Sequence, residues 1–268
     1  LSSYQTCDLN HAPDIAVLLN LHPEHIQWHR THDQYYHDKC NLLRRGAPIN
    51  IVNFNEARTS IDDAVSFNDP DKIHYEGKII FDGNKVIGSA DAHPLIGDHN
   101  LENICASFSI CKQLELDLSA CLQASFGYQG LPHRLQAIGP INGITYINDS
   151  ISTDPEATIA ALNALSNKHV TLIIGGEDRK QDFDALCVLI NKNNVNAICV
   201  YETGSRIFEQ INSNNKLRAL DIEDAVRKAK EITPKDGYIV LSPAAPSYDA
   251  FKDFEVRGDL FMKLAKNT

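Results

Sequence analysis

A polar segment at residues 148–154 is the first place where this sequence could carry chemistry. It reads Asn-Asp-Ser-Ile-Ser-Thr-Asp and lies between an apolar run at 144–147 and a helical pattern at 156–165. Proteins with α/β folds bind ligands where a strand ends and a helix begins, because free N–H groups point out of the helix there. We therefore predict that residues 130–154, which lead into this cluster, form both a domain junction and part of an active site.

Two later loops have the same position after an apolar run. Residues 175–179 (GGEDR) follow the run 170–174, and residues 242–247 (SPAAPS) follow the run 238–241. The N–H groups of the first loop and Arg179 could hold an anion, and the small residues of the second would let a ligand approach closely. Each loop could equally be a tight turn, but three such loops at one sheet edge favour a pocket.

Five histidines lie within sixteen residues near the N-terminus: His22, His25, His29, His32 and His37. His25 and His29 are four residues apart and could share a metal on one face of a helix. The sequence has no HExxH motif, and a histidine cluster without a cysteine or carboxylate pattern is a weak metal signal. Solvated or internally hydrogen-bonded histidines are the alternative.

Composition excludes several classes of protein. The 268 residues carry a net charge of −10, which argues against a general nucleic-acid surface, and no apolar run approaches the ~20 residues that span a bilayer. The seven cysteines show no CxxC pair, as is typical of reduced cytoplasmic thiols. Neither GxxxxGK[ST] nor GxGxxG occurs, so the sequence contains no recognisable triphosphate or dinucleotide cradle.

The pattern of elements predicts two α/β domains, at 1–129 and 130–268. In the first we expect strands at 15–21 and 49–54, then short strands and turns over 60–94 that include a hairpin of 78–81 with 85–88. The helices expected there are 31–45, 101–114 (with an N-cap region at 98–100) and 119–126. In the second we expect a strand pair, 135–138 with 144–147, then strands at 170–174, 197–200 and 238–241, with a turn at 202–204. The helices expected there are 156–165, 183–191, 205–211, 222–232 and 249–265. Alternating strands and helices predict a parallel, doubly wound sheet.

Seven segments, in chain order, resemble those of the Mur ligases. They are LSSYQ, LNLHPEHIQWH followed by YHDK, GDHNLEN, GLPHR, YINDSIST, IIGGEDRKQDF and LSPAAPSYDAFKDFEVRG. The resemblance covers almost the whole chain. It implies the C-terminal part of a P-loop-type central ATP-binding domain at 1–129, then a Rossmann-like domain for glutamate and nucleotide at 130–268. It also implies a C-terminal fragment without the UDP-binding domain and the P-loop, inactive by itself.

Within the family, the resemblance is greatest to ligases that add D-glutamate to UDP-N-acetylmuramoyl-L-alanine during peptidoglycan precursor synthesis. It implies ATP and Mg²⁺ as cofactors, an acyl-phosphate intermediate, and a cytoplasmic monomer that binds no nucleic acid and does not enter the membrane. The alternatives are the branch that adds L-glutamate, a different Mur ligase or folylpolyglutamate synthetase, and a non-catalytic module that binds glutamate or nucleotide.

The resemblance also implies roles for single residues. His25 and Lys39 would be catalytic and bind magnesium, with Lys39 carbamylated because hard Mg²⁺ needs oxygen ligands and an ammonium has none to offer. The positions implied for the nucleotide are Asn103, Arg134 and Asp149. Those implied for glutamate are Thr153, Arg179, Ser247, Tyr248 and Phe254, and those implied for the UDP-linked substrate are Ser2 and Gln5.

Two positions depart from the family pattern. Ile151 stands where the family usually has lysine, and Arg179 stands where the family usually has the lysine of GG-x-x-Lys. Arginine can hold a carboxylate with two parallel hydrogen bonds, whereas lysine acts as a point charge. Both departures concern the incoming amino acid and resemble the branch that adds L-glutamate.

Overall fold

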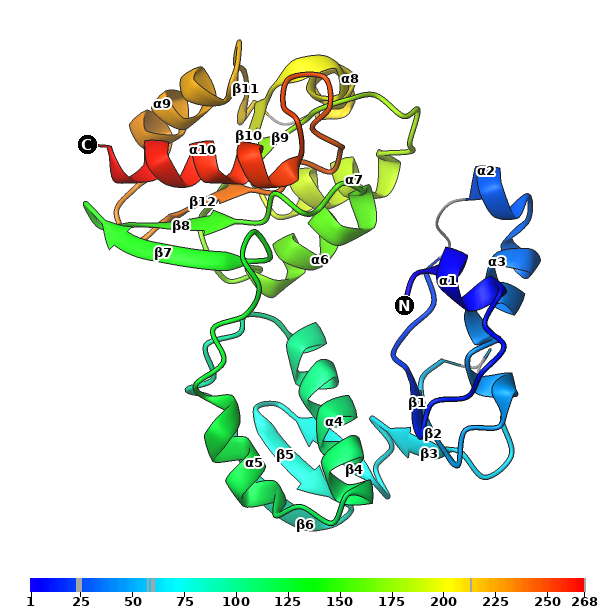
Figure 1. Ribbon diagram of the computed structural model, residues 1–268. Coiled ribbons are helices and arrows are strands. Elements are labelled where there is room, and N and C mark those ends of the chain that lie inside the picture. The colour runs from blue at the N-terminus through cyan, green and yellow to red at the C-terminus, as the bar shows by residue number, and fades with distance from the viewer. Residues whose placement is uncertain (23–25, 57, 59–60, 213, 268) are drawn as a thin grey trace. The chain divides into compact units, whose positions relative to one another are not determined.

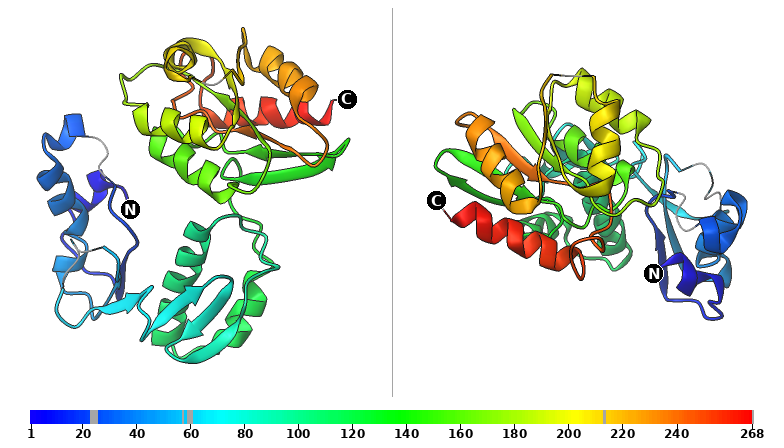
Figure 2. Two further views of the ribbon diagram at one scale, coloured as in Figure 1. Left: turned by 180° about the vertical axis from the view of Figure 1, so that it is seen from behind. Right: turned by 90° about the horizontal axis from the view of Figure 1, so that it is seen from above.

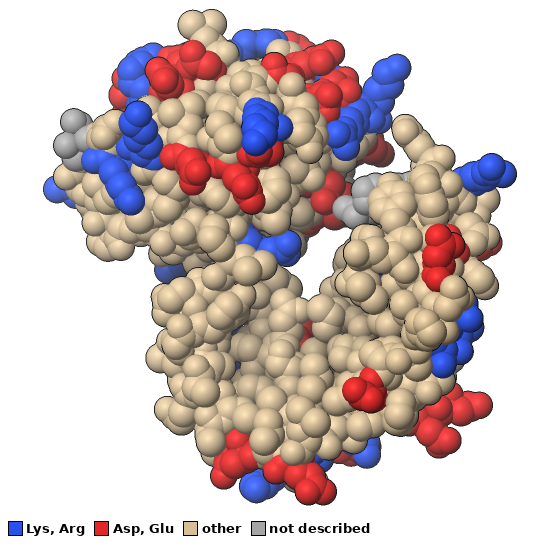
Figure 3. Space-filling model, in the orientation of Figure 1, with Lys and Arg blue, Asp and Glu red and all other residues tan. Residues whose placement is uncertain are grey.

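The computed structural model describes residues 1–22, 26–56, 58, 61–212 and 214–267. These residues form two compact units (Figures 1 and 2), one of 1–94 with 98–128 and the other of 95–97 with 129–268. Within the described ranges, no helix is both long enough and apolar enough to cross a membrane. On the face shown in Figure 3, acidic and basic side chains are interspersed.

The first unit is built on a six-stranded sheet in the order β1-β2-β3-β4-β5-β6. Its strands are β1 (Ile15–Leu18), β2 (Ile49–Asn53), β3 (Val65–Phe67), β4 (Ile73–Glu76), β5 (Ile79–Asp82) and β6 (Lys85–Ser89). Strands β1 to β4 pair in parallel, and β4, β5 and β6 pair antiparallel. One core cluster contains Leu101 and Phe108 packed with Ile51 and Phe67, and a second cluster contains Leu18, Leu43 and Val52.

The helices of the first unit match the prediction in part. They are α1 (Ser3–Cys7), α2 (Ile26–His29), α3 (His32–Cys40), a 3₁₀ turn (Leu43–Arg45), α4 (Asp98–Gln113) and α5 (Leu118–Ser125). The prediction of a single helix at 31–45 was wrong, because α3 ends at Cys40 and only the short 3₁₀ turn follows. Residues 98–100 lie inside α4 and do not precede it. The short strands expected within 60–94 are confirmed by β3 and β4, although their bounds were not predicted, and helix α1, with five residues, was not anticipated.

The second unit contains a doubly wound sheet in the order β11-β10-β9-β12-β8-β7. Its strands are β7 (Gln136–Ile141), β8 (Ile144–Asn148), β9 (Val170–Ile174), β10 (Asn196–Cys199), β11 (Lys216–Arg218) and β12 (Tyr238–Leu241). All neighbours pair in parallel except β7, which forms the predicted antiparallel pair with β8. The predicted parallel sheet is therefore confirmed, with one antiparallel edge strand.

Helices cover both faces of this sheet (Figure 1). They are α6 (Pro155–Ala164), α7 (Asp184–Lys192), α8 (Tyr201–Gln210), α9 (Ile222–Ile232) and α10 (Phe254–Lys266). Side chains of α6, α7 and α8 share one core cluster, and those of α9 and α10 share the other. The turn expected at 202–204 lies inside α8, and the last helix begins at Phe254, where Asp253 caps it by accepting a hydrogen bond from the Val256 N–H at 2.9 Å.

Strand β9 is the centre of the second unit. It pairs with β10 on one side and β12 on the other, and all five of its residues are buried. A strand covered on both faces can be apolar throughout, which explains why its sequence reads as an uninterrupted apolar run.

We expect Leu172→Ala in β9 to lower the free energy of unfolding of the second unit by about 2–5 kcal/mol, because it leaves a cavity in a closed core. Leu172 is 0% exposed, whereas Leu220 of the same unit is 86% exposed and gives the matched control. Leu220→Ala should change the free energy of unfolding by less than about 0.5 kcal/mol. Urea unfolding measures both, and equal losses would contradict this account of the core.

Candidate functional site

The polar segment after β8 is folded into the protein around Asp149. This residue is 2% exposed. Its Oδ1 accepts a hydrogen bond from the Leu135 N–H at 3.0 Å, and its Oδ2 accepts from the Ser152 and Ser242 hydroxyls at 2.6 and 2.8 Å. Burial raises the pKa of the Asp149 carboxyl, against the opposing effect of these hydrogen bonds and of Arg134. The Asp149 side chain therefore connects Leu135, in front of β7, with the segment after β8 and with Ser242 at the end of β12.

Asn148, one residue earlier, anchors the last helix to the junction. It is fully buried, and its Nδ2 lies 3.0 Å from Nδ1 of His133 and donates to the Gly258 carbonyl at 3.2 Å. A Cβ at Gly258 would lie 2.2 Å from Nδ1 of His133, so only glycine lets α10 approach this closely. The sequence showed His133 and Gly258 inside two quoted motifs, but neither residue was assigned a role.

The loops after β9 and β12 bind each other. The Gly175 N–H donates to the Pro243 carbonyl and the Glu177 N–H to the Pro246 carbonyl, both at 2.9 Å. A Cβ at Gly176 would lie 2.1 Å from the Pro246 oxygen, and residues 242–247 are all buried. Two of the N–H groups that we expected to hold an anion are thus used within the fold, and the small residues allow loop to approach loop.

Arg257 of α10 lies where these loops meet, and sequence reasoning missed it. It is 1% exposed. Its Nε and Nη2 donate to the Ser150 hydroxyl and carbonyl at 3.0 and 2.9 Å, and its Nη1 donates to the Ala245 carbonyl at 3.1 Å. The available signal was the motif FKDFEVRG, where an arginine follows the helix start.

The five residues predicted to bind glutamate all belong to the second unit and follow the carboxyl ends of its strands. Thr153 follows β8, Arg179 follows β9, Ser247 and Tyr248 follow β12, and Phe254 begins α10. The Arg179 guanidinium lies 5.8 Å from the centroid of the Tyr248 ring, and its Nε lies 3.2 Å from Oε2 of Glu177. Arg179 and Tyr248 are exposed, Thr153 and Phe254 are half-buried, and Ser247 is buried.

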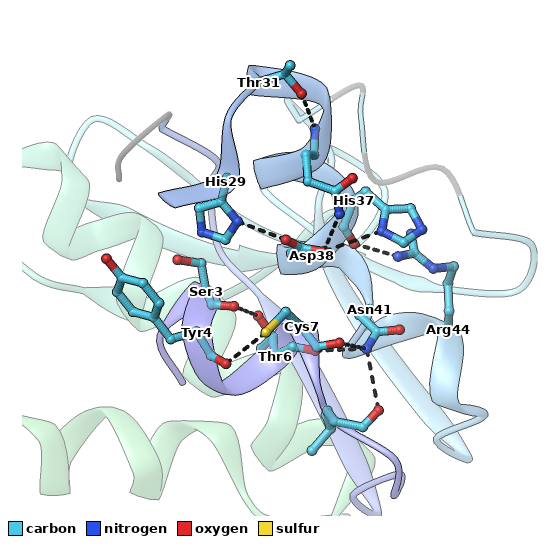
Figure 4. A network of polar contacts seen from close by, with 12 residues as sticks. Ser3, Tyr4, Thr6, Cys7, His29, Thr31, His37, Asp38, Asn41 and Arg44 are labelled. Carbon is cyan, nitrogen blue, oxygen red and sulfur yellow. Dashed lines mark hydrogen bonds and ion pairs between the residues drawn. The ribbon is translucent and has the colours of Figure 1, made fainter. Parts of the chain in front are cut away.

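A second polar network lies in the first unit around Asp38 (Figure 4). His29 has a fully buried side chain, and its Nδ1 lies 2.8 Å from Oδ2 of Asp38. Gln34 donates to Oδ1 of Asp38 at 2.7 Å, and Nδ1 of His37 lies 3.5 Å from the same oxygen. Burial alone would raise the pKa of Asp38, but these three hydrogen bonds hold it below its usual value. His29 is thus bound to a carboxylate inside the unit.

The predicted magnesium residues are only partly described. His25 lies outside the described residues, and Nζ of Lys39 donates to the Leu1 carbonyl at 3.1 Å. Among the residues that the structure describes, no group of three or more His, Cys, Asp or Glu could hold a metal ion. The described side chains do not by themselves form a magnesium site.

The remaining predicted residues lie on or near the surface. Ser2 and Gln5 are exposed and form the capping box of α1, in which Ser2 N donates to Oε1 of Gln5 at 2.9 Å and Gln5 N donates to the Ser2 hydroxyl at 3.3 Å. Asn103 is exposed on α4, where its amide donates to Oδ1 of Asn100 at 3.4 Å, and Arg134 is exposed in the junction. Of the three predicted nucleotide residues, only Asp149 is buried.

Comparison with known proteins matches both parts of the chain. Residues 2–111 match the Mur ligase middle domain, and residues 133–245 match the Mur ligase glutamate ligase domain. A relative from Micromonospora sp., named UDP-N-acetylmuramoyl-L-alanine--L-glutamate ligase, is 35% identical over 100% of this chain and 63% of its own length. A relative of the same name from Xanthomonas oryzae pv. oryzae is 35% identical over 99% of this chain and 60% of its own length. The chain therefore spans about three fifths of the length of these relatives.

Solved structures have the same fold. The MurF ligase of Thermotoga maritima, in complex with ADP, superposes on this chain with a TM-score of 0.68 at 16% sequence identity. The match covers 95% of this chain and 62% of the MurF chain. MurF from Acinetobacter baumannii matches with a TM-score of 0.71 at 14% sequence identity, over 99% of this chain and 62% of the MurF chain. With two successive domain matches and relatives that align along its whole length, the chain belongs to the Mur ligase family.

Proposed function

We propose that this protein is an ATP-dependent ligase that joins L-glutamate to UDP-N-acetylmuramoyl-L-alanine in peptidoglycan precursor synthesis. One observation carries the proposal: the residues expected to bind glutamate come from four separate segments and all lie at the carboxyl edge of one parallel sheet. Open α/β sheets bind their ligands at that edge. The relatives named as glutamate ligases, at 33–35% identity, support the same reaction.

The enantiomer is proposed from two residues and from the relatives. Arg179 and Ile151 replace the two lysines of the usual family pattern, and both follow strands at the edge where glutamate would bind. The relatives from Micromonospora sp. and Xanthomonas oryzae pv. oryzae are named L-glutamate ligases. D-glutamate is the other outcome of the test below.

The proposed reaction proceeds through an acyl phosphate. The alanine carboxylate accepts the γ-phosphoryl group of ATP and ADP leaves. The glutamate amine then attacks the acyl carbon and loses a proton, and the tetrahedral intermediate expels inorganic phosphate to leave an amide bond. Arg179 would bind a glutamate carboxylate with its guanidinium, and this would hold the amine in position for attack.

The nucleotide and metal residues remain proposals with different structural support. Asn103 and Arg134 are exposed and open to a nucleotide, whereas the carboxylate of Asp149 is buried in hydrogen bonds and would act by holding the junction in place. Lys39 forms no ion pair with any described residue, so its carbamylation would displace only the hydrogen bond to Leu1. Carbamylated Lys39 and His25 would hold Mg²⁺, which neutralises phosphoryl charge when bound.

The first test compares the two enantiomers in ATP-dependent phosphate release, with the complete protein and UDP-N-acetylmuramoyl-L-alanine. We expect turnover with L-glutamate and little with D-glutamate. The 268-residue chain alone should release no phosphate, because its sequence has no GxxxxGK[ST] motif to bind the triphosphate. Turnover by the chain alone would contradict the need for a P-loop, and turnover with D-glutamate only would reverse the assignment of the enantiomer.

The second test concerns Arg179. We expect Arg179→Met to raise the KM for glutamate by about 10- to 100-fold, since it removes a charged hydrogen-bonding partner worth about 1.5–3 kcal/mol. Arg179→Lys should raise this KM less, because the charge remains. Arg227→Met is the matched control, since Arg227 lies on α9 and pairs there with Asp224 and Glu231. An unchanged KM for glutamate in Arg179→Met would remove this residue from the site.

A further inference from the structure

Arg257 is a buried cation without a carboxylate partner. It is the largest fully buried side chain, and within the described ranges it forms no ion pair with an acidic residue. Burial lowers the pKa of the guanidinium to about 10, with Asp249 and Tyr201 acting in the opposite direction. Partial desolvation raises the pKa of the Asp249 carboxyl, although the residue is exposed, and its charge acts on Arg257 without a direct ion pair.

The hydrogen bonds of Arg257 all go to neutral oxygens. Three of its N–H groups donate to the hydroxyl and carbonyl of Ser150 and to the carbonyl of Ala245, at 2.9–3.1 Å. These bonds satisfy the geometry of the guanidinium with neutral partners, and the charge of Asp249 acts on it without a direct hydrogen bond or ion pair. An unpaired charge inside a protein is costly, and stable folds normally pair it or replace it with an apolar residue.

The Arg257 guanidinium lies among the loops that follow three strands of the second unit. Ser150 belongs to the loop after β8 and Ala245 to the loop after β12, and a Cβ at Gly176, after β9, would lie 3.1 Å from Nη1 of Arg257. Three strand-end loops therefore converge on one guanidinium. Thr153, Ser247 and Tyr248, which we propose to bind glutamate, lie on two of these loops, within three residues of the atoms that Arg257 holds.

We propose that Arg257 is a specificity-determining positioning residue for the dicarboxylate substrate, an inference that depends on the proposed glutamate function. It holds together the loops after β8 and β12, which carry Thr153, Ser247 and Tyr248, and no carboxylate is bonded directly to its positive charge. Because the surroundings of Arg257 are poor in water, its charge acts across several ångströms with little screening. The residues on these loops would thus favour an anionic amino acid over a neutral one, even though the guanidinium itself is covered.

The sharpest test neutralises the charge without removing the arginine. Ser150→Asp places a carboxylate beside Arg257, and Ser150→Asn places a group of the same size without charge. We expect Ser150→Asp to raise the KM for glutamate about tenfold relative to Ser150→Asn, with the KM for ATP equal in both. Both variants enlarge the side chain by the same number of heavy atoms and remove the hydroxyl that donates to the Phe254 carbonyl, so the two variants differ chiefly in charge. Equal KM values for glutamate in the two variants would overturn the inference.

Substitution of the arginine itself gives the second measurement. Arg257→Met should raise the KM for glutamate by about tenfold or more, and Arg257→Lys should recover part of that loss because it restores the charge. Thermal unfolding of each variant measures the structural contribution separately. A purely structural role predicts lower stability with the same KM in every variant that folds, and this result would overturn the proposal.

The wild-type assay keeps the two proposals distinct. If the complete wild-type protein uses neither enantiomer of glutamate, the proposed function fails and the inference about Arg257 fails with it. If the wild type uses glutamate but the Ser150→Asp and Ser150→Asn variants have equal KM values, only the role of Arg257 fails. Arg227→Met should leave the KM for glutamate unchanged, because Arg227 lies in ion pairs on the outer side of α9.

Discussion

The second unit depends on hydrogen bonds that tie the carboxyl ends of its central strands to one another. Asp149, at the end of β8, accepts a hydrogen bond from Ser242 at the end of β12. Arg257 of α10 donates to the loops that follow these two strands. The loop after β9 then closes on the loop after β12 through two N–H groups. Without these two side chains, the loop after β8 would lose its hydrogen bonds to Ser242 and Arg257, whereas the loops after β9 and β12 would keep their backbone bonds.

Glycine is required where this convergence is closest. Gly175 has φ +127°, and a Cβ there would lie 1.9 Å from the Val200 carbonyl, while a Cβ at Gly176 would meet Pro246. Both positions therefore require glycine because the loops after β9, β10 and β12 pack closely there, whether or not a ligand binds. This explains why a glycine pair after a buried strand is a weak indication of an anion site: the same sequence is needed when another loop, and not a phosphate, approaches the backbone.

The sequence predicts long, regular elements well and side-chain networks poorly. Residues 170–174 and 238–241 were predicted with the bounds of β9 and β12, because an apolar run between turns has few alternatives. β11, with three residues, and the early end of α3 depend on local contacts that no periodicity records. In the site, Arg179 and Tyr248 were both predicted to bind glutamate. Asn148 belonged to the predicted polar segment but had no assigned role, and Arg257 was missed, since each has a partner about 110 residues away in sequence.

Within the described residues, Asp149 and Arg257 are both buried in the second unit and form no ion pair with each other. Each lies beside Ser150, each is nearly fully buried, and each is bound to neutral partners: three donors for the carboxylate and three acceptors for the guanidinium. Burial shifts both pKa values toward the uncharged forms. A core selected for stability alone would pair these groups or replace them with apolar side chains. Their separation leaves the guanidinium without a directly bonded carboxylate where the loops after β8 and β12 meet, and the role proposed for Arg257 depends on that arrangement.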